Sequence, residues 1–269
     1  MADAPSETFA APIPLRAPPP EGEAVLEGDV VLNIAGEAVA FHFEVPQGPT
    51  TVEALLPVFQ GLANEVARRA ASKVIADGGT ISCRAGCGAC CRQAVPVSEA
   101  EAHMIAALVE AMPEPRRSQV RARFETAERR LEETALGSRL VDLADGKTVI
   151  EVGTRYFDLA VPCPFLEAES CSIYLDRPLR CREYFVTSPA AACAAMAPGA
   201  VHRVPLAGAP SKALYAAGIQ NTPEGLGAAY PGPLVRRALS RALAGAAGAG
   251  VDRRGGRPAG GPVRLSPAA

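Results

Sequence analysis

The stretch CRAGCGACC, Cys83 to Cys91, holds four cysteines within nine residues, and two of them are adjacent. Four more cysteines follow further along the chain, and the sequence contains no others. Thiolates bind soft cations, and Zn²⁺ or an iron–sulfur cluster usually takes four of them, so eight cysteines suffice for one or two sites. We predict that all eight bind metal: Cys83, Cys87, Cys90, Cys91, Cys163, Cys171, Cys181 and Cys193.

The spacing of the first four cysteines favours chelation. Two residues separate Cys87 from Cys90, which is a common chelating interval, and Gly86 and Gly88 free the backbone to wrap around an ion. The neighbours Cys90 and Cys91 point in different directions on a strand or on a helix, so they do not readily bind the same ion. Either the pair serves two sites, or one of its members is not a ligand.

The last four cysteines lie in short motifs with turn-forming residues, CPFL, CSIY and RPLRC, and then at Cys193. The helices predicted between the two groups must fold back as an αα-hairpin for the groups to meet. Closing so long a loop costs only a few kcal/mol, and the binding of a structural zinc, about 10 to 16 kcal/mol, offsets that cost. Four arginines flank the cysteines and either stabilise a negatively charged thiolate centre or are solvated: Arg84, Arg92, Arg180 and Arg182.

Composition and charge exclude several classes of protein. The chain has 269 residues, 48% hydrophobic and 21% charged, which is typical of a globular protein that folds without cysteine cross-links. A net charge of -2 supplies no basic field for nucleic acid, and no apolar run is long enough for a membrane span. The N-terminus is acidic and proline-rich, unlike a signal peptide. We therefore expect a cytoplasmic protein, in which clustered cysteines bind metal rather than form disulfides.

Local composition divides the chain into five expected parts. Pro and Ala dominate its beginning, and Gly, Ala and Pro dominate its end, so both ends are expected to be disordered. The one helix expected near the C-terminus spans residues 233–243. The parts are a disordered segment at residues 1–22, a β-hairpin at 23–48, a cysteine-cluster domain at 49–195, an extension with one helix at 196–245 and a disordered tail at 246–269.

Helical periodicity begins after the expected hairpin. Thr50 and Glu53 have the spacing of a capping box, and the helix that follows is expected to end at residues 77–79, Asp-Gly-Gly. Pro57 lacks a backbone N–H, so we expect the helix to kink or to restart there.

Further helices are predicted between the two cysteine groups. Ser98 and Glu101 have the spacing of a second capping box and predict a helix that extends to Met112. A third helix is predicted at residues 114–136, where apolar residues recur at helical spacing, and a short one at 138–144.

The chain before Cys163 has a different pattern. Phe157, Leu159 and Val161 alternate with other residues, which predicts an extended segment that leads into Cys163. Together, the patterns predict a mainly α fold with a small β-hairpin. The helical domain is expected to be organised around a cysteine-ligated metal or iron–sulfur centre.

A radical-SAM site is a weaker alternative. The spacing Cys83-x3-Cys87-x2-Cys90 occurs in that superfamily, where three cysteines leave one iron of a cluster open. However, Ala89 replaces the usual aromatic residue, no train of βα units follows, and five cysteines would remain unexplained.

The other polar residues suggest no further chemistry. His42, His103 and His202 share no local chelating motif with a cysteine, and the sequence has no phosphate loop or recognisable catalytic triad. Tyr174 and Tyr184 lie within the cysteine motifs, where each either packs against the centre or contacts a substrate. We therefore assign no catalytic residue and no organic cofactor.

The segments CRAGCGACCR, CPFL, CSIY and RPLRCREY, followed by Cys193, resemble the YkgJ-like cysteine-cluster family, which has a CxxCxxCC signature. The resemblance covers roughly residues 80–195 and implies a zinc- or iron-chelating domain. One departure is the gap between Cys83 and Cys87, which has three residues where the signature has two. The family is also similar to the cluster-bearing part of flagellin lysine N-methylases, which implies that some members hold an iron–sulfur cluster and act as methyltransferases.

The expected function is therefore the binding of zinc or iron, with a slight preference for iron as an iron–sulfur cluster. Two other functions stay open. One is an iron–sulfur enzyme, a methyltransferase or an oxidoreductase, and the other is a structural zinc module that binds a protein partner. The expected partner is a protein or a small molecule rather than nucleic acid or a membrane.

Overall fold

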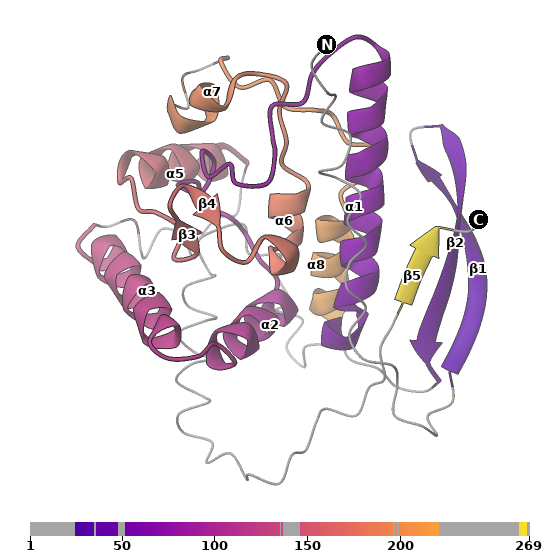
Figure 1. Ribbon diagram of the computed structural model, residues 1–269, viewed down its shortest axis with the longest axis horizontal. Coiled ribbons are helices and arrows are strands. Elements are labelled where there is room, and N and C mark those ends of the chain that lie inside the picture. Colours follow the sequence, from indigo (N-terminus) through magenta and orange to yellow (C-terminus); the bar gives the residue numbers. More distant parts are fainter. Residues whose placement is uncertain are drawn as a thin grey trace, which may run out of the picture.

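The structure is a computed structural model, and it describes residues 25–34, 36–47, 52–134, 136, 146–195, 197, 199–220 and 264–267. Helices make up most of its regular structure, and a small antiparallel sheet lies to one side (Figure 1). The predicted mainly α fold with a small hairpin is confirmed. Within the described residues, no helix has the length and apolar character that a membrane span requires.

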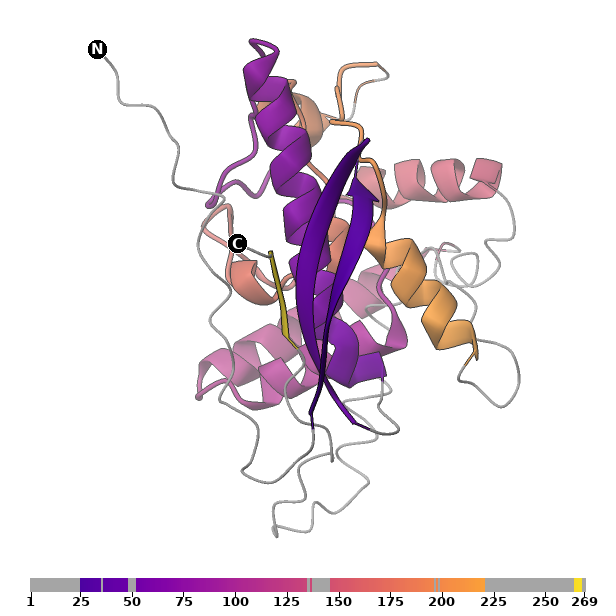
Figure 2. The ribbon, with the colours of Figure 1, turned by 90° about the vertical axis from the view of Figure 1, so that its right-hand side faces the viewer.

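Strands β1 (Val25–Ile34) and β2 (Glu37–Pro46) form the predicted hairpin and pair antiparallel along their full lengths. Gly36 at the turn has a φ of 89°, a conformation that a residue without a Cβ adopts readily. One face of the hairpin buries Phe41 against Val66 of helix α1, and Figure 2 shows the sheet lying lengthwise along that helix.

A third strand, β5 (Arg264–Pro267), pairs antiparallel with β2 and places Arg264 opposite Glu44. The predicted disordered tail, residues 246–269, was therefore wrong at these four residues. Without β5, strand β2 would present unpaired N–H and C=O groups at an open edge of the sheet. The composition of the tail does not predict this pairing, because it depends on a strand at the other end of the chain. The rest of that tail and the segment predicted to be disordered at residues 1–22 lie outside the described residues.

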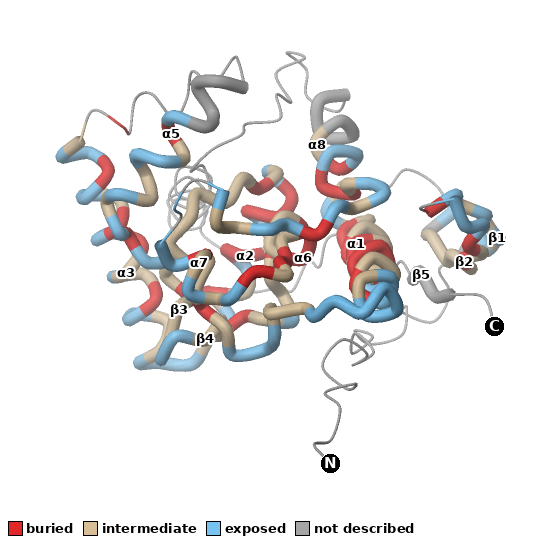
Figure 3. The backbone as a smooth tube through the Cα atoms, turned by 90° about the horizontal axis from the view of Figure 1, so that it is seen from above, coloured by how far each residue is buried: buried red, intermediate tan, exposed pale blue. Residues whose placement is uncertain are grey.

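Helix α1 (Val52–Ala76) is the long central element of the fold, and buried residues concentrate along it and around α6 (Figure 3). The helix continues through Pro57, so the predicted restart was wrong. Proline removes a single backbone hydrogen bond there, and the packed faces of the helix offset that loss. Its end lies where predicted, with Gly78 at a φ of 82°. The predicted cap at Thr50 lies outside the described residues.

Helices α2 (Glu99–Glu110) and α3 (Arg116–Glu132) are the pair predicted between the two cysteine groups. Both hydrogen bonds of the predicted capping box between Ser98 and Glu101 are present at the start of α2. The two helices contact each other and share a core with the chain around the later cysteines. This core consists of Ile105, Ala106, Val109, Val120, Phe124, Phe165 and Ile173.

The segment before Cys163 is helix α5 (Gly146–Asp158), so the predicted extended chain was wrong. The alternation that suggested a strand covers only the last residues of the helix and the turn after it. A helical face buries Val152 against Leu131 and Leu136, and this packing outweighs the local alternation.

Helix α8 (Pro210–Gln220) packs against α1 and against α6 (Leu179–Arg182). Its Leu214 is fully buried beside Leu179. The sequence analysis missed this helix because few large apolar residues stand among its Ala and Gly residues. The short helices predicted at residues 138–144 and 233–243 fall outside the described residues.

Candidate metal centre

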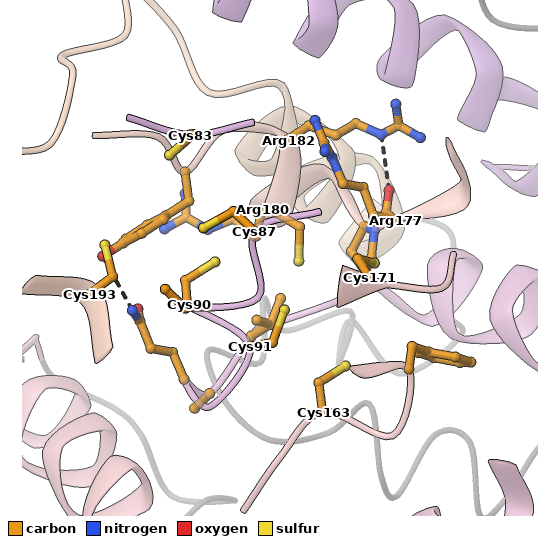
Figure 4. Close-up of a pocket in the computed structure, with 18 of the residues that line it drawn as sticks. Cys83, Cys87, Cys90, Cys91, Cys163, Cys171, Arg177, Arg180, Arg182 and Cys193 are labelled. Carbon is orange, nitrogen blue, oxygen red and sulfur yellow. Dashed lines mark hydrogen bonds between the residues drawn. The ribbon is translucent and has the colours of Figure 1, made fainter. Parts of the chain in front are cut away.

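All eight cysteines line one cavity of about 320 Å³, and Figure 4 shows most of them around it. The predicted convergence of the two cysteine groups is therefore present in the structure. Every one of the eight is a free thiol. Cys193 is buried, and the other seven are partly exposed. Their role as metal ligands stays a prediction.

The first four cysteines lie in the loop between α1 and α2, which folds as a series of tight turns. The N–H of Cys87 donates to the carbonyl of Arg84 at 3.2 Å, and the N–H of Cys91 donates to the carbonyl of Gly88 at 2.9 Å. Gly86 has a φ of 83°, which favours glycine at this position. The turns bring all four thiols to the same cavity.

A two-stranded hairpin, β3 (Leu166–Glu167) and β4 (Ser170–Cys171), positions the middle of the second group. Both of its turn residues have positive φ, 48° and 57°, as in a tight two-residue turn. Gly88 lies directly against this hairpin. A Cβ at Gly88 would lie 2.4 Å from Cδ1 of Leu166 and 2.5 Å from the carbonyl oxygen of Glu169, so only glycine fits without movement.

Two backbone contacts join the cysteine groups directly. The N–H of Cys163 donates to the carbonyl of Cys91 at 2.7 Å, and the N–H of Ser82 donates to the carbonyl of Val186 at 3.0 Å. The N–H of Val186 also donates to Sγ of Cys83 at 3.3 Å. The walls of the cavity are therefore tied together by hydrogen bonds on both sides.

Short helices position the last two cysteines: Cys181 lies in α6, and Cys193 lies in α7 (Ala190–Ala195). The carboxylate of Glu101, which caps α2, also accepts the N–H of Leu179 at 2.7 Å at the start of α6. Glu101 has no exposed surface, and burial raises its pKa. The sequence analysis identified this glutamate only as a cap, because its second partner is distant along the chain.

The environment of the thiols favours their neutral form. Burial raises the pKa of Cys83 and of Cys163 to about 11. The pKa of Cys90 is raised by a hydrogen bond with the thiol of Cys91 and by burial, and burial also raises the pKa of Cys181. A cation that binds these sulfurs must therefore displace protons, since the thiolate is the form that binds metal.

Arg177 supplies positive charge to the second group of cysteines. Burial raises the pKa of Cys171 and of Cys181, and the charge of Arg177 acts in the opposite direction on both. Its guanidinium lies 3.7 Å above the ring of Tyr174, which holds it beside the cavity. The sequence analysis did not single out Arg177, since no cysteine adjoins it in the sequence.

Three of the four arginines that the sequence analysis named bind other groups. Arg182 is buried, donates to two backbone carbonyls and donates to Oδ1 of Asn64 at 3.1 Å. Arg92 pairs with a glutamate of the β3–β4 turn, and Arg180 pairs with a glutamate at the end of α6. Arg84 lines the cavity. Arg180 and Arg182 also line the cavity, so these two arginines fix the loops around the thiols as well as border them.

The side chains that line the cavity offer sulfur as their only common metal-binding donor, because none of them is a histidine, an aspartate or a glutamate. Nδ1 of His42 lies 3.1 Å from a carboxylate oxygen of Asp29, and Nδ1 of His103 lies 3.1 Å from one of Glu53. In the described part of the chain, no three His, Cys, Asp or Glu side chains are placed to hold a single metal ion together.

Residues 82–197 match the family model CxxCxxCC, which is described as a "putative zinc- or iron-chelating domain". This segment belongs to the CxxCxxCC family. Comparison with curated proteins and with solved structures found no match. The donor set of the CxxCxxCC domain fits its description, because thiolate sulfur binds both zinc and iron.

Proposed function

We propose that the CxxCxxCC domain binds zinc or iron through the thiolates that line its cavity. The convergence of all eight cysteines on one cavity is the observation that supports this function most. Buried cysteines that serve only as small apolar residues have no reason to gather in this way. The absence of other metal-binding donors among the lining residues favours a metal that prefers sulfur.

Iron in an iron–sulfur cluster is the form of metal that we favour. A tetrahedral zinc site draws four sulfurs to about 2.3 Å from one ion. In the described part of the chain the thiols surround a cavity of about 320 Å³, and no three of them are placed to share an ion. Each thiolate of a 4Fe–4S cluster binds a different iron atom, so such a cluster accommodates a wider set of sulfurs.

Apolar residues and one arginine around the thiols suit a negatively charged iron–sulfur cluster. Ile105, Phe124 and Phe165 line it with apolar surface, which limits the access of water. The guanidinium of Arg177 offsets part of the negative charge of deprotonated cysteines. A bound iron–sulfur cluster would supply single-electron transfer at this position.

Metal analysis of the full chain, purified without oxygen, tests this function. We expect a brown protein that contains iron and acid-labile sulfide, measured per chain by mass spectrometry of the metal and by colorimetry. Replacement of Cys181 by Ser should lower the metal content, because it removes one of the eight thiols that line the cavity. Ala191→Ser is the matched control, since it adds a hydroxyl to an exposed position of α7 and leaves all eight thiols intact.

Two results would change the proposal in different ways. A colourless protein with stoichiometric zinc and no sulfide would retain metal binding and remove the cluster. A chain that holds neither metal, and takes up neither after anaerobic reduction, would contradict the function itself.

A further inference from the structure

Five arginines line the cavity, and none of the described residues that line it is an aspartate or a glutamate. Arg180 and Arg182 donate hydrogen bonds to other groups of the protein. The guanidinium groups of the other three, Arg84, Arg177 and Arg203, form no hydrogen bond or ion pair with another described residue. The buried Nε of Arg177 is one of these unpartnered donors.

These three are the exceptions among the arginines whose side chains the structure describes. Each of the others has a hydrogen-bond or ion-pair partner. A guanidinium carries five N–H donors and no acceptor, and it forms its strongest hydrogen bonds with oxygen anions. The arginines that retain this capacity are therefore all at the cavity. Arg177 acts on the cysteines of the second group, which leaves Arg84 and Arg203 without a role.

Arg84 and Arg203 lie in neighbouring segments of the chain. The N–H of Ser82, two residues before Arg84, donates to the carbonyl of Val186 at 3.0 Å. Val186 in turn forms an antiparallel bridge with Arg203. Both arginines are exposed residues that line the cavity. They therefore lie at the same end of the cavity, where it opens to solvent.

Arg203 is held in place by an aromatic ring. Its guanidinium lies 5.0 Å above the ring of Tyr184, and the hydroxyl of Tyr184 accepts a hydrogen bond from Nε2 of Gln93 at 3.3 Å. Stacking uses the flat face of a guanidinium and leaves the N–H groups at its edge free. A side chain that is already fixed loses little freedom when a ligand binds, so this arrangement favours binding.

We infer that Arg84 and Arg203 bind a small organic anion, a carboxylate or a phosphate ester, at the opening of the cavity. Both kinds of anion present paired oxygens that match the fork of a guanidinium. Elsewhere in the cavity, Ile105, Phe124 and Leu131 provide apolar surface for the carbon part of such a molecule. The inference goes beyond metal binding and holds for either metal, because it rests on arginines rather than on thiols.

Titration calorimetry of the full chain with inorganic phosphate and, separately, with succinate tests the inference at constant ionic strength. We expect saturable binding of at least one of these anions by the wild-type chain. Arg84→Gln and Arg203→Gln should each weaken that binding about 10-fold or more, because each substitution removes charge-assisted hydrogen bonds. Arg203→Lys keeps the charge without the fork and should weaken the binding less.

Arg117→Gln is the matched control, since it removes the same charge from α3, away from the cavity, and should leave the anion affinity unchanged. The metal content of every variant is measured on the same samples. We expect the Arg84 and Arg203 variants to keep the metal content of the wild-type chain. Loss of anion binding with the metal retained separates this site from the proposed metal binding.

Protection from phenylglyoxal, a reagent that modifies arginine, needs no variant. The anion that binds should protect Arg84 and Arg203 of the wild-type chain and leave Arg117 unprotected, as peptide mass spectrometry measures. Binding of only one of the two anions would support the inference and identify the chemical class. Absence of binding by both anions, absence of protection at both arginines, or equal weakening by Arg117→Gln would each overturn the inference, whatever the metal content.

Discussion

The backbone N–H of Cys163 donates to the carbonyl of Cys91 at 2.7 Å and thereby joins the two cysteine groups at the wall of the cavity. This bond forms between backbone groups of two loops. The loops reach each other because α2 and α3 fold back between them. The packing of these helices therefore places the two groups of thiols at one cavity.

Replacement of Gly88 by Ala should destabilise the domain by about 1 to 3 kcal/mol, because a Cβ there would lie 2.4 Å from Cδ1 of Leu166 and 2.5 Å from the carbonyl of Glu169. Urea unfolding measures the loss. Gly208→Ala is the control, since a Cβ at Gly208 would meet nothing within 4 Å. Equal stability of the two variants would contradict the close approach of the loops.

Replacement of Glu101 by Gln should lower the stability by about 1 to 3 kcal/mol at neutral pH. The two carboxylate oxygens accept backbone N–H groups of Ser98 and Leu179, and the amide of glutamine, which has one oxygen, can accept only one of these bonds. The metal content should also fall, because the start of α6, the helix that carries Cys181, is then held less firmly. Glu99→Gln is the control, since Glu99 is an exposed residue in the same helical turn. Retention of full stability would show that the shared carboxylate does not fix α6.

Replacement of Arg177 by Gln should weaken metal binding about 10-fold or more, because the variant lacks the positive charge that favours thiolates at Cys171 and Cys181. Competition with a chromophoric chelator measures the affinity. Arg117→Gln removes an arginine of α3 that pairs with Glu114 away from the cavity, and this variant should leave the affinity unchanged. If both variants bound metal equally well, Arg177 would have no electrostatic role.

The metal-free chain should lose stability at alkaline pH. Burial raises the pKa of Cys83 and Cys163 from 9.0 to about 11, so their neutral thiols contribute stability that is complete below pH 9 and is lost as the pH rises through 11. Urea unfolding across this range should show a decrease on the order of 1 to 3 kcal/mol. The metal-loaded chain holds thiolates already and should lack this decrease. The same loss in both forms would indicate that these thiols do not bind the metal.

Local patterns in the sequence predicted several elements correctly. The hairpin turns at Gly36, α1 ends shortly before Gly78, and Ser98 with Glu101 begins α2, because each of these features depends on residues close together in the chain. The alternation of Phe157, Leu159 and Val161 predicts an extended chain before Cys163, and this prediction was wrong. Helix α5 forms there because one of its faces packs against Leu131. Strand β5 was missed for a related reason, since its partner lies at the other end of the chain.

The sequence by itself determined the chemistry of this protein: eight thiols, their spacing and their family, since these depend only on residue types and intervals. Only the tertiary structure decided which groups meet. It brought Cys163 to Cys91, made Glu101 the support of a second helix and placed Arg177 beside the sulfurs. These contacts join residues far apart in the chain, and their geometry follows from the packing of α1, α2 and α3 rather than from any local pattern.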